Sequence, residues 1–382
     1  MPAAPEMADR YDYLAPRLRL FVSLDIQGST SFKYASDNVE TWLPIIHWFY
    51  IETQSTVERS WLKIAQRLRH DVPAAEPGPE PLFWKSAGDE LLFVKEITHP
   101  LQCLSAVLAF KDVLVQQNDA IQRRSDGRLK LKATAWLGGF PNLNKEIPLV
   151  GSYADAYGDD AMVQDAIVQN TMVQIARLDQ GTLPHQRDFV GPSIDLGFRL
   201  AELATPRRFV VSVELAYVLA DMMVRNDLID RVNLQVDEGQ VLKGILNDKE
   251  YPVIWVDALS HRSPRSSLER LMSRTSCNAE ALRDMCSHFI AEAPILVMPY
   301  IVVADRCVYG TVPPEHREKL ATIRRRISQE MGKEEQFVHD QAAAAGSGSL
   351  DLELSKNLEE QAAKVRGRQV GDDRAPPDDK EA

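Results

Sequence analysis

Two aspartates, Asp25 and Asp89, each stand at the end of a short apolar run with a glycine nearby. LRLFVSL precedes Asp25, while Asp89 follows Gly88 between the runs LFWKSA and ELLFVK. Two carboxylates that meet at such strand ends repel each other unless a cation neutralises them, and hard divalent cations take oxygen ligands. The pattern therefore suggests a divalent metal site. For either aspartate alone a turn or helix N-cap role remains the alternative, because Asp beside Gly is common in turns.

These aspartates belong to an ordered series of short motifs. The series reads FVSLDIQGST, KSAGDELLF, DFVGPSIDLGFRLAEL, RFVVSVELA and LKGI. In its order and internal offsets it resembles the class III nucleotidyl cyclases, over roughly Leu18 to Val256. The positions that match that family's motifs are Asp25, Ile26, Lys85, Gly88, Asp89, Asp188, Gly191 and Arg199.

The resemblance implies a two-metal active site. Asp25, Asp89 and the backbone carbonyl of Ile26 would hold two Mg²⁺ or Mn²⁺ ions, which activate a ribose 3′-hydroxyl and neutralise the triphosphate. Arg199 would stabilise the charge that develops at the α-phosphate. Taken singly, Arg199 could equally be a solvated surface charge, and only its place in the series of motifs supports a catalytic role.

Phosphate binding is implied for two further places. The backbone amides of Gly28, Ser29 and Thr30, at the start of a helix, would bind phosphate oxygens. Lys243 in LKGI matches the family's triphosphate-binding lysine, although alone it too could be a surface charge. One departure concerns Asp195, where the family usually has an Asn that orients the ribose. An aspartate accepts a hydrogen bond but donates none, and it adds negative charge near phosphate.

The resemblance puts Lys85 and Asp188 at base-reading positions. A lysine donor and a carboxylate acceptor suit adenine, cytosine and uracil, whereas guanine fits them badly. Tyr50, Trp84 and Phe189 are bulky enough to narrow a base pocket, and each could instead be a core residue. UTP is favoured over CTP by a small margin, because the lysine would donate to O4 while the aspartate accepts from N3–H.

The C-terminal part carries a second resemblance. Leu282 to Ser328 is similar to the AGS-C sensor domain, most closely in MPYIVVAD, TVPPEH and EKLATIRRRI. A class III cyclase joined to such a module resembles the pyrimidine cyclases of Pycsar systems. That implies a uridylate or cytidylate cyclase whose cyclic product activates a separate effector protein in anti-phage defence. An ATP-using adenylate cyclase and a non-catalytic nucleotide-binding sensor are the alternatives for the chain, and a dimerisation or packing appendage is the alternative for this C-terminal unit.

The family also implies a homodimer. In class III cyclases the metal carboxylates come from one subunit, and the base-reading and arginine residues come from its partner. Because this chain carries one full set, two copies would form two shared sites.

Periodicity predicts the elements that must position these residues. Apolar runs indicate strands at Leu18–Leu24, 82–87, 90–95, 129–139 and Arg208–Ser212, and around Val241 and Val253. Helical spacing indicates helices over Asn38–Leu68, Leu101–Asn118, Gly191–Leu203 and Val213–Leu219, with an exposed loop at Asp71–Pro81. The hairpin around Gly88 requires antiparallel pairing although strands and helices otherwise alternate. We therefore expect an α+β fold with helices on a mixed sheet, which the resemblance specifies as the ferredoxin-like cyclase homology domain.

Composition shifts divide the chain into five parts. We expect an N-terminal extension (1–17), the cyclase homology domain (18–260), a polar linker (261–267), a small α/β unit (268–340) and a disordered tail (341–382). The tail has almost no large apolar residues with which to build a core.

Charge and cysteine content exclude several classes. The chain has 44 Lys and Arg against 55 Asp and Glu, a net charge of −11, which disfavours nucleic acid as a partner. Its four cysteines form no CxxC motif and indicate reduced thiols in a cytoplasmic protein. The most apolar stretch, Ala293–Ala304, is broken by Pro299 and too short to span a bilayer. We therefore expect no membrane partner.

Overall fold

The computed structural model describes six stretches of the chain. These are residues 14–36, 38–73, 76–149, 187–228, 231–258 and 277–329. Contacts divide the chain into a first compact unit, Met1–Arg325, and a second, Arg326–Ala382, and the fold that follows is that of the first. The expected linker 261–267 and tail 341–382 lie outside the described residues, as do most of the expected N-terminal extension and the first residues of the expected small unit.

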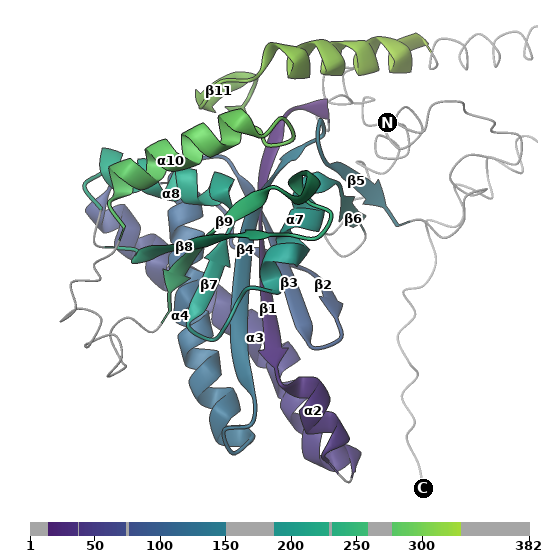
Figure 1. The fold of residues 1–382 in the computed structure, drawn as a ribbon, viewed down its shortest axis with the longest axis vertical. Helices are drawn as coiled ribbons and strands as arrows, with labels where there is room; N and C mark the ends of the chain where they lie inside the picture. The colour runs from purple at the N-terminus through teal and green to yellow at the C-terminus, as the bar shows by residue number, and fades with distance from the viewer. Residues whose placement is uncertain are drawn as a thin grey trace, which may run out of the picture. The chain divides into compact units, whose positions relative to one another are not determined.

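A seven-stranded sheet forms the centre of the unit (Figure 1). Its strands are β1 (Arg17–Gln27), β2 (Leu82–Ala87), β3 (Glu90–Ile97), β4 (Lys130–Phe140), β7 (Arg208–Val211), β8 (Leu234–Val241) and β9 (Glu250–Asp257). They lie in the order β2-β3-β1-β4-β7-β9-β8, and only β4 and β7 pair in parallel. The mixed sheet of the predicted α+β fold is thereby confirmed.

The side chains of β1 alternate between two apolar layers. Leu20, Val22 and Leu24 are buried in the larger core, while Phe21 enters a smaller cluster with Trp84 and other aromatic residues. Because neighbouring side chains of a strand point to opposite faces, each layer covers one face of the sheet. Asp25 follows Phe21 by four residues along the strand, so both side chains are on the same face, the one that carries the smaller, aromatic cluster.

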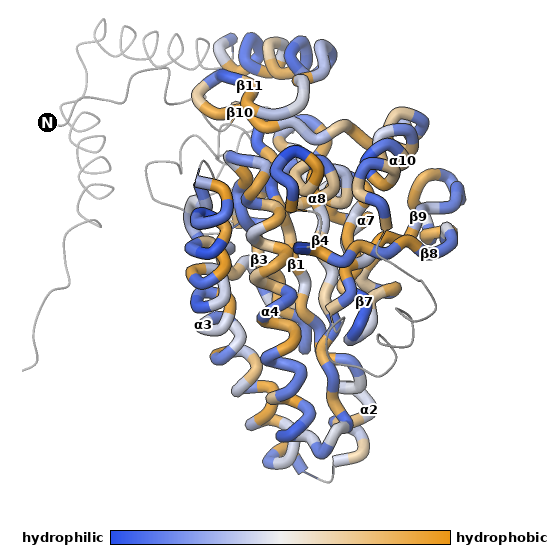
Figure 2. Tube along the Cα trace, turned by 90° about the vertical axis from the view of Figure 1, so that its left-hand side faces the viewer, coloured by the Kyte–Doolittle hydropathy of each residue, from blue (hydrophilic) through white to orange (hydrophobic). Residues whose placement is uncertain are grey.

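Helices cover both faces of the sheet. The long helices are α3 (Val39–Asp71), α4 (Leu101–Arg124), α7 (Pro192–Ala201) and α8 (Val213–Arg225), with the six-residue α2 (Ser29–Tyr34) after β1. The apolar sides of α3, α4 and α8 enter the larger core. Helix α7 contributes Ile194 to the aromatic cluster and Leu196 and Leu200 to the larger core. Figure 2 shows hydrophobic residues along β1 and its neighbours and a mixture of both kinds along α3.

A two-stranded ribbon adjoins α7 in the sequence. It consists of β5 (Lys145–Pro148) and β6 (Arg187–Val190), which pair antiparallel. The side chain of Asn144 connects this region to the helix: its Oδ1 accepts from the backbone amide of Ser193 at 3.0 Å, and its Nδ2 donates to the carbonyl of Gly139 at 2.9 Å. The start of α7 is thus tied to the end of β4.

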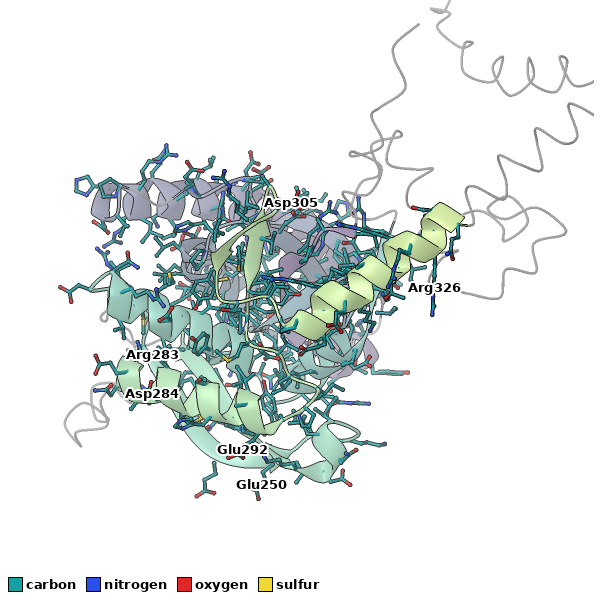
Figure 3. All side chains as sticks on the ribbon, turned by 90° about the horizontal axis from the view of Figure 1, so that it is seen from above. Glu250, Arg283, Asp284, Glu292, Asp305 and Arg326 are labelled. Carbon is teal, nitrogen blue, oxygen red and sulfur yellow. The ribbon has the colours of Figure 1, made fainter. Side chains whose placement is uncertain are left out.

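The C-terminal part of the unit contains α10 (Ala279–Glu292), the hairpin of β10 (Ile301–Val303) and β11 (Arg306–Tyr309), and a helix from residue 314. Figure 3 shows Arg283 at one end of α10, Glu292 at the other and Asp305 at the hairpin turn. Buried residues of α10 belong to the same core as the sheet. The Tyr309 hydroxyl also donates to Asp221 of α8 at 2.9 Å. The C-terminal part therefore shares its interior with the sheet.

Candidate active site

Asp25 and Asp89 lie together on the side of the sheet where β1 ends and β3 begins, which we call the metal-motif edge. Asp25 on β1 is directly opposite Glu90 on β3, so Asp89, one residue earlier, follows the turn beside it. The amide of Ile26 donates to the carbonyl of Asp89 at 3.3 Å, which ties the two segments together. The turn needs Gly88, whose φ of +68° is in the left-handed region. Strand pairing thus brings the two predicted metal ligands to neighbouring positions.

Glu90 adds a third carboxyl group to this edge. Burial raises its pKa, and the nearby charges of Asp25 and Asp89 raise it further, against a hydrogen bond from Ser23 and the charge of Lys132. The Ser23 hydroxyl donates to Glu90 Oε1 at 2.5 Å. Sequence reasoning missed Glu90, although it directly follows the Gly-Asp motif. Three acidic groups therefore concentrate negative charge where β1 ends and β3 begins.

Two lysines face these acids. Lys132 Nζ on β4 lies 3.0 Å from Asp25 Oδ2, and Lys33 Nζ on α2 lies 3.8 Å from Asp89 Oδ1. Neither lysine was predicted. The sequence does contain a sign of Lys132. Apolar and basic residues alternate in LKLKATAW, which places Lys132 on the face of the strand opposite the buried Leu131. The lysines show that this edge attracts positive charge.

Two hydroxyl groups fix the turn that carries Asp89. Ser29 Oγ donates to Asp89 Oδ2, and the Tyr50 hydroxyl donates to the carbonyl of Gly88. Tyr50 comes from α3, whose inner side packs beneath the sheet. Tyr50, expected near a base, thus contacts the backbone of the metal-motif turn. Trp84 and Phe189 are at most 2% exposed in the aromatic cluster, so for these two the core alternative holds.

The expected phosphate-binding segment forms the junction of β1 and α2. Gly28 has a φ of +90° and occupies the N-cap position of α2. A Cβ atom there would lie 3.1 Å from the carbonyl oxygen of Arg128, so only glycine suits the position. Ser29 is buried beneath the turn, while Thr30 is exposed. The segment therefore lies directly beside Asp89.

The donor set at this edge suits a hard cation. Asp25 and Asp89 provide carboxylate oxygens on adjacent segments, and Ile26 provides a backbone carbonyl. Among the described residues, no three His, Cys, Asp or Glu side chains are spaced as a complete metal cage. Mg²⁺ and Mn²⁺ sites that use one or two carboxylates draw their other ligands from water and substrate phosphate. The residues thus fit a substrate-completed metal site.

Lys85 and Asp188 form an ion pair. Lys85 Nζ lies 2.7 Å from Asp188 Oδ1, and both side chains are about one-third exposed. The aromatic cluster beneath positions them: the Trp84 indole donates to the carbonyl of Arg187, and the Lys85 ammonium lies 4.3 Å from the Trp84 ring centroid. The two residues predicted to act together on one base are therefore adjacent across β2 and β6.

Arg199 and Asp195 lie on α7. The helix packs closely on the sheet because Gly197 has no side chain: a Cβ there would fall 2.2 Å from the Trp136 ring. Asp195 is exposed in the first turn, and Arg199 pairs with Glu202 at 3.2 Å. Both side chains therefore lie on the outer side of a rigidly packed helix.

Lys243 lies exposed on the turn between β8 and the short 3₁₀ helix Leu246–Asp248. No hydrogen bond or ion pair within the described part of the chain joins Lys243 or Arg199 to Asp25 or Asp89. One copy of the chain therefore forms two of the predicted groups, the metal-motif edge and the Lys85–Asp188 pair. It makes no hydrogen bond or ion pair from Arg199 or Lys243 to the two aspartates within the described residues.

Comparison with known proteins found similar structures but no similar sequences. No protein-family model matches the sequence. No curated protein matches it either. The structure is similar to the adenylyl cyclase CyaB from P. aeruginosa (TM-score 0.40, 12% identity, 63% of this chain and 94% of that one). It is also similar to the guanylyl cyclase Cya2, with a TM-score of 0.35, 14% identity and coverage of 63% of this chain and 91% of that one. For the guanylyl cyclase domain of RhoGC from Blastocladiella emersonii the TM-score is 0.37, the identity 10% and the coverage 63% of this chain and 96% of that one. At these TM-scores, neither family nor activity follows from the likeness.

None of the helices in the described stretches combines the length and the apolar character that crossing a bilayer requires.

Proposed function

We propose that the protein is a metal-dependent nucleotide cyclase that converts a pyrimidine nucleoside triphosphate, UTP in preference to CTP, into its 3′,5′-cyclic monophosphate and pyrophosphate. One observation carries the proposal: strand pairing places Asp25 beside the Asp89 turn, on an edge crowded with acidic groups. The motif series that resembles class III cyclases gives this edge its chemical role.

In the proposed reaction the ribose 3′-oxygen forms a bond to the α-phosphorus, the bond from that phosphorus to the bridging oxygen breaks, and the hydroxyl proton is lost to solvent. Bound Mg²⁺ or Mn²⁺ would supply Lewis-acid activation of the hydroxyl and neutralise the phosphates. Asp25, Asp89 and the Ile26 carbonyl would hold the ions. The hydrogen bond from Ser29 keeps the Asp89 carboxylate in place. Backbone amides of Gly28 to Thr30 would bind phosphate oxygens.

Base selection would rest on Lys85 and Asp188. Their separation of 2.7 Å supports joint action, because a donor and an acceptor that touch each other can contact neighbouring groups on one base edge. With uracil, Lys85 donates to O4 and Asp188 accepts from N3–H. Lys85 and Asp188 would thereby each exchange the contact of their ion pair for a hydrogen bond to the base.

The base-reading pair and the remaining groups would come from a second copy. Arg199 and Lys243 are exposed or half-exposed, and among the described residues neither forms a hydrogen bond or ion pair with Asp25 or Asp89. In the proposed homodimer each lies across the interface from the partner's acids, where Arg199 stabilises charge at the α-phosphate and Lys243 binds the triphosphate. Asp195 would replace the amide that orients the ribose.

A signalling role is proposed for the product. The similarity of Leu282 to Ser328 to the AGS-C module supports an enzyme whose cyclic nucleotide activates a separate effector protein in anti-phage defence. Infection of cells that carry the gene, followed by nucleotide extraction, tests this role. A rise in cUMP within one infection cycle is expected, and an unchanged nucleotide pool would exclude it.

The catalytic proposal is tested by product analysis. The purified protein is incubated with Mn²⁺ and each of the four NTPs in turn, and products are separated by chromatography and identified by mass. cUMP as the main product is expected, with loss of turnover in Asp89→Asn. A dominant cAMP product would instead identify an adenylate cyclase. Nucleotide binding without release of pyrophosphate would identify a non-catalytic sensor.

A further inference from the structure

A small pocket lies where the sheet meets the C-terminal part of the first unit. Its walls are the start of β1, the end of β4 with the loop that follows, the first turns of α7 and α8, and residues 295–300. The pocket has a volume of about 30 Å³, room for about two water molecules. Ile295, Val297 and Met298 give one side an apolar surface. The pocket shares no residue with the candidate active site.

Two buried polar side chains that line this pocket carry atoms without hydrogen-bond partners, although Glu214 also has hydrogen bonds to Ser212 and to its own backbone. Asn142 is 5% exposed and Glu214 is 6% exposed. Asn142 Oδ1, Asn142 Nδ2 and Glu214 Oε2 are all buried and unpaired. The hydroxyl of Tyr300, which lies near Asn142, is hydrogen-bonded to His316 Nδ1 at 2.9 Å. A buried polar group without a partner destabilises the fold, so an occupant that pairs with these atoms would bind favourably.

The unpaired atoms define what this occupant must offer. With Glu214 ionised, two acceptors, Asn142 Oδ1 and Glu214 Oε2, require N–H or O–H donors, and one donor, Asn142 Nδ2, requires an acceptor. A primary carboxamide carries this set on one planar group: two N–H donors and one carbonyl oxygen. Its three heavy atoms also suit a space of about two waters, and an attached apolar body would meet the side chains of residues 295–298.

We propose that this pocket binds a small molecule through a primary carboxamide, whose carbonyl accepts from Asn142 Nδ2 and whose NH₂ group donates to Asn142 Oδ1 and Glu214 Oε2. The binding does not depend on the proposed catalytic activity, because it uses none of the same residues.

The surrounding contacts connect the pocket to α7. Lys319, from the C-terminal helix, donates to the carbonyl of Asn142 at 3.3 Å. Two residues further along the same loop, Asn144 holds the amide of Ser193 at the start of α7. An occupant that fixes the Asn142 side chain therefore also restrains the loop from which α7 begins. Amide hydrogen exchange in residues 192–201 is expected to slow when the pocket is filled.

The test uses the full chain and ligand-observed NMR by saturation transfer. Propionamide is the probe, and N,N-dimethylpropionamide is its matched control, with the same carbonyl and no N–H donor. We expect saturation transfer to propionamide and a signal at least tenfold weaker for the dimethyl compound. This comparison uses only the wild-type protein, so it does not depend on the folding of any variant.

Variants then assign the contact. Asn142→Leu and Glu214→Leu are each expected to weaken propionamide binding at least tenfold, whereas Gln116→Leu, an exposed amide on α4, leaves it unchanged. Equal binding of both amides, or wild-type affinity in both pocket variants, would overturn the proposal. So would absence of saturation transfer at tens of millimolar propionamide, because ordered water would then be the occupant.

Discussion

Lys132 and Asp25 form an ion pair inside the candidate active site. Lys132 Nζ lies 3.0 Å from Asp25 Oδ2 and donates to the carbonyl of Ala201, the last residue of α7, at 3.1 Å. The two residues lie opposite each other in the pairing of β1 with β4, so their contact is set by the sheet register. One ammonium group therefore links a proposed metal ligand to the helix that carries Arg199.

This pairing predicts that Lys132 weakens metal binding. In Lys132→Gln the positive charge is absent, so repulsion of a cation at Asp25 falls. We expect Mn²⁺ to bind about fivefold to tenfold more tightly, which corresponds to about 1 kcal/mol. Electron paramagnetic resonance of free Mn²⁺ measures the affinity without substrate. Lys63→Gln is the control, because Lys63 pairs with Asp112 at 3.3 Å on another surface. Equal Mn²⁺ affinity in all three proteins would contradict the prediction.

Shared sites predict rescue between inactive variants. Asp89→Ala and Arg199→Ala homodimers should each lose activity. After mixing and exchange of subunits, half of the dimers would contain one intact site, so about a quarter of wild-type turnover is expected. Pyrophosphate release measures the recovery, with size-exclusion chromatography to verify that dimers form. A mixture as inactive as its components would show that the sites are not shared.

The Lys85–Asp188 pair predicts base selectivity. Asp188→Asn replaces a pure acceptor with a group that also donates, and Lys85→Met removes the donor. Either change should raise KM for the preferred triphosphate about tenfold or more, because one hydrogen bond to the base is lost and its partner is left unpaired. Mn²⁺ affinity should not change, which separates this effect from damage to the metal edge. Wild-type KM for all four triphosphates in both variants would rule out base reading by this pair.

Glu214 predicts a pH dependence of stability. Burial raises its pKa from 4.5 to about 7, so the folded state holds a proton that the unfolded state releases between these values. The free energy of unfolding should therefore fall by about 3 kcal/mol in total as pH rises from 4.5 to 7, and it should stay at this lower value above pH 7. Its neighbours Tyr251 and Cys286 have raised pKa values and His316, across the pocket, has a lowered one, so none of the three adds charge at neutral pH.

Glu214→Gln removes this titration. Urea unfolding of the wild type and the variant at pH 5 and pH 8 measures the difference. The wild type should lose stability between these pH values relative to Glu214→Gln. Parallel losses in both proteins would assign the dependence to other groups.

Local sequence patterns were sufficient for most of the elements. The apolar run Leu18–Leu24 predicted β1, and the glycine between two apolar runs predicted the β2–β3 hairpin, because both signals lie within a few residues. Element ends were less accurate. The helix predicted over Leu101–Asn118 continues to Arg124, since its last turns are polar and the basic residues there favour a helix C-terminus.

Only those residues of the candidate site that belong to a recognisable sequence motif could be predicted. Asp25 and Asp89 carry a recognisable context, whereas Lys132 and Glu90 reach the same edge through strand register, which one sequence does not reveal. The pocket around Asn142 depends on the packing of the C-terminal part against the sheet, a contact between segments far apart in the chain. Pairwise register and long-range packing are the information that the sequence patterns lacked.

The common interior of the sheet and the C-terminal part has a consequence for how the protein unfolds. Leu282 and Ile290 of α10 fill the same apolar core as the strands, and Tyr309 satisfies the buried carboxylate of Asp221. A chain shortened at residue 276 would leave an apolar side of α8 facing water and a carboxylate without its hydroxyl donor. Heating should accordingly melt the sheet and the C-terminal part in a single cooperative transition, and removal of the C-terminal part should destabilise the sheet.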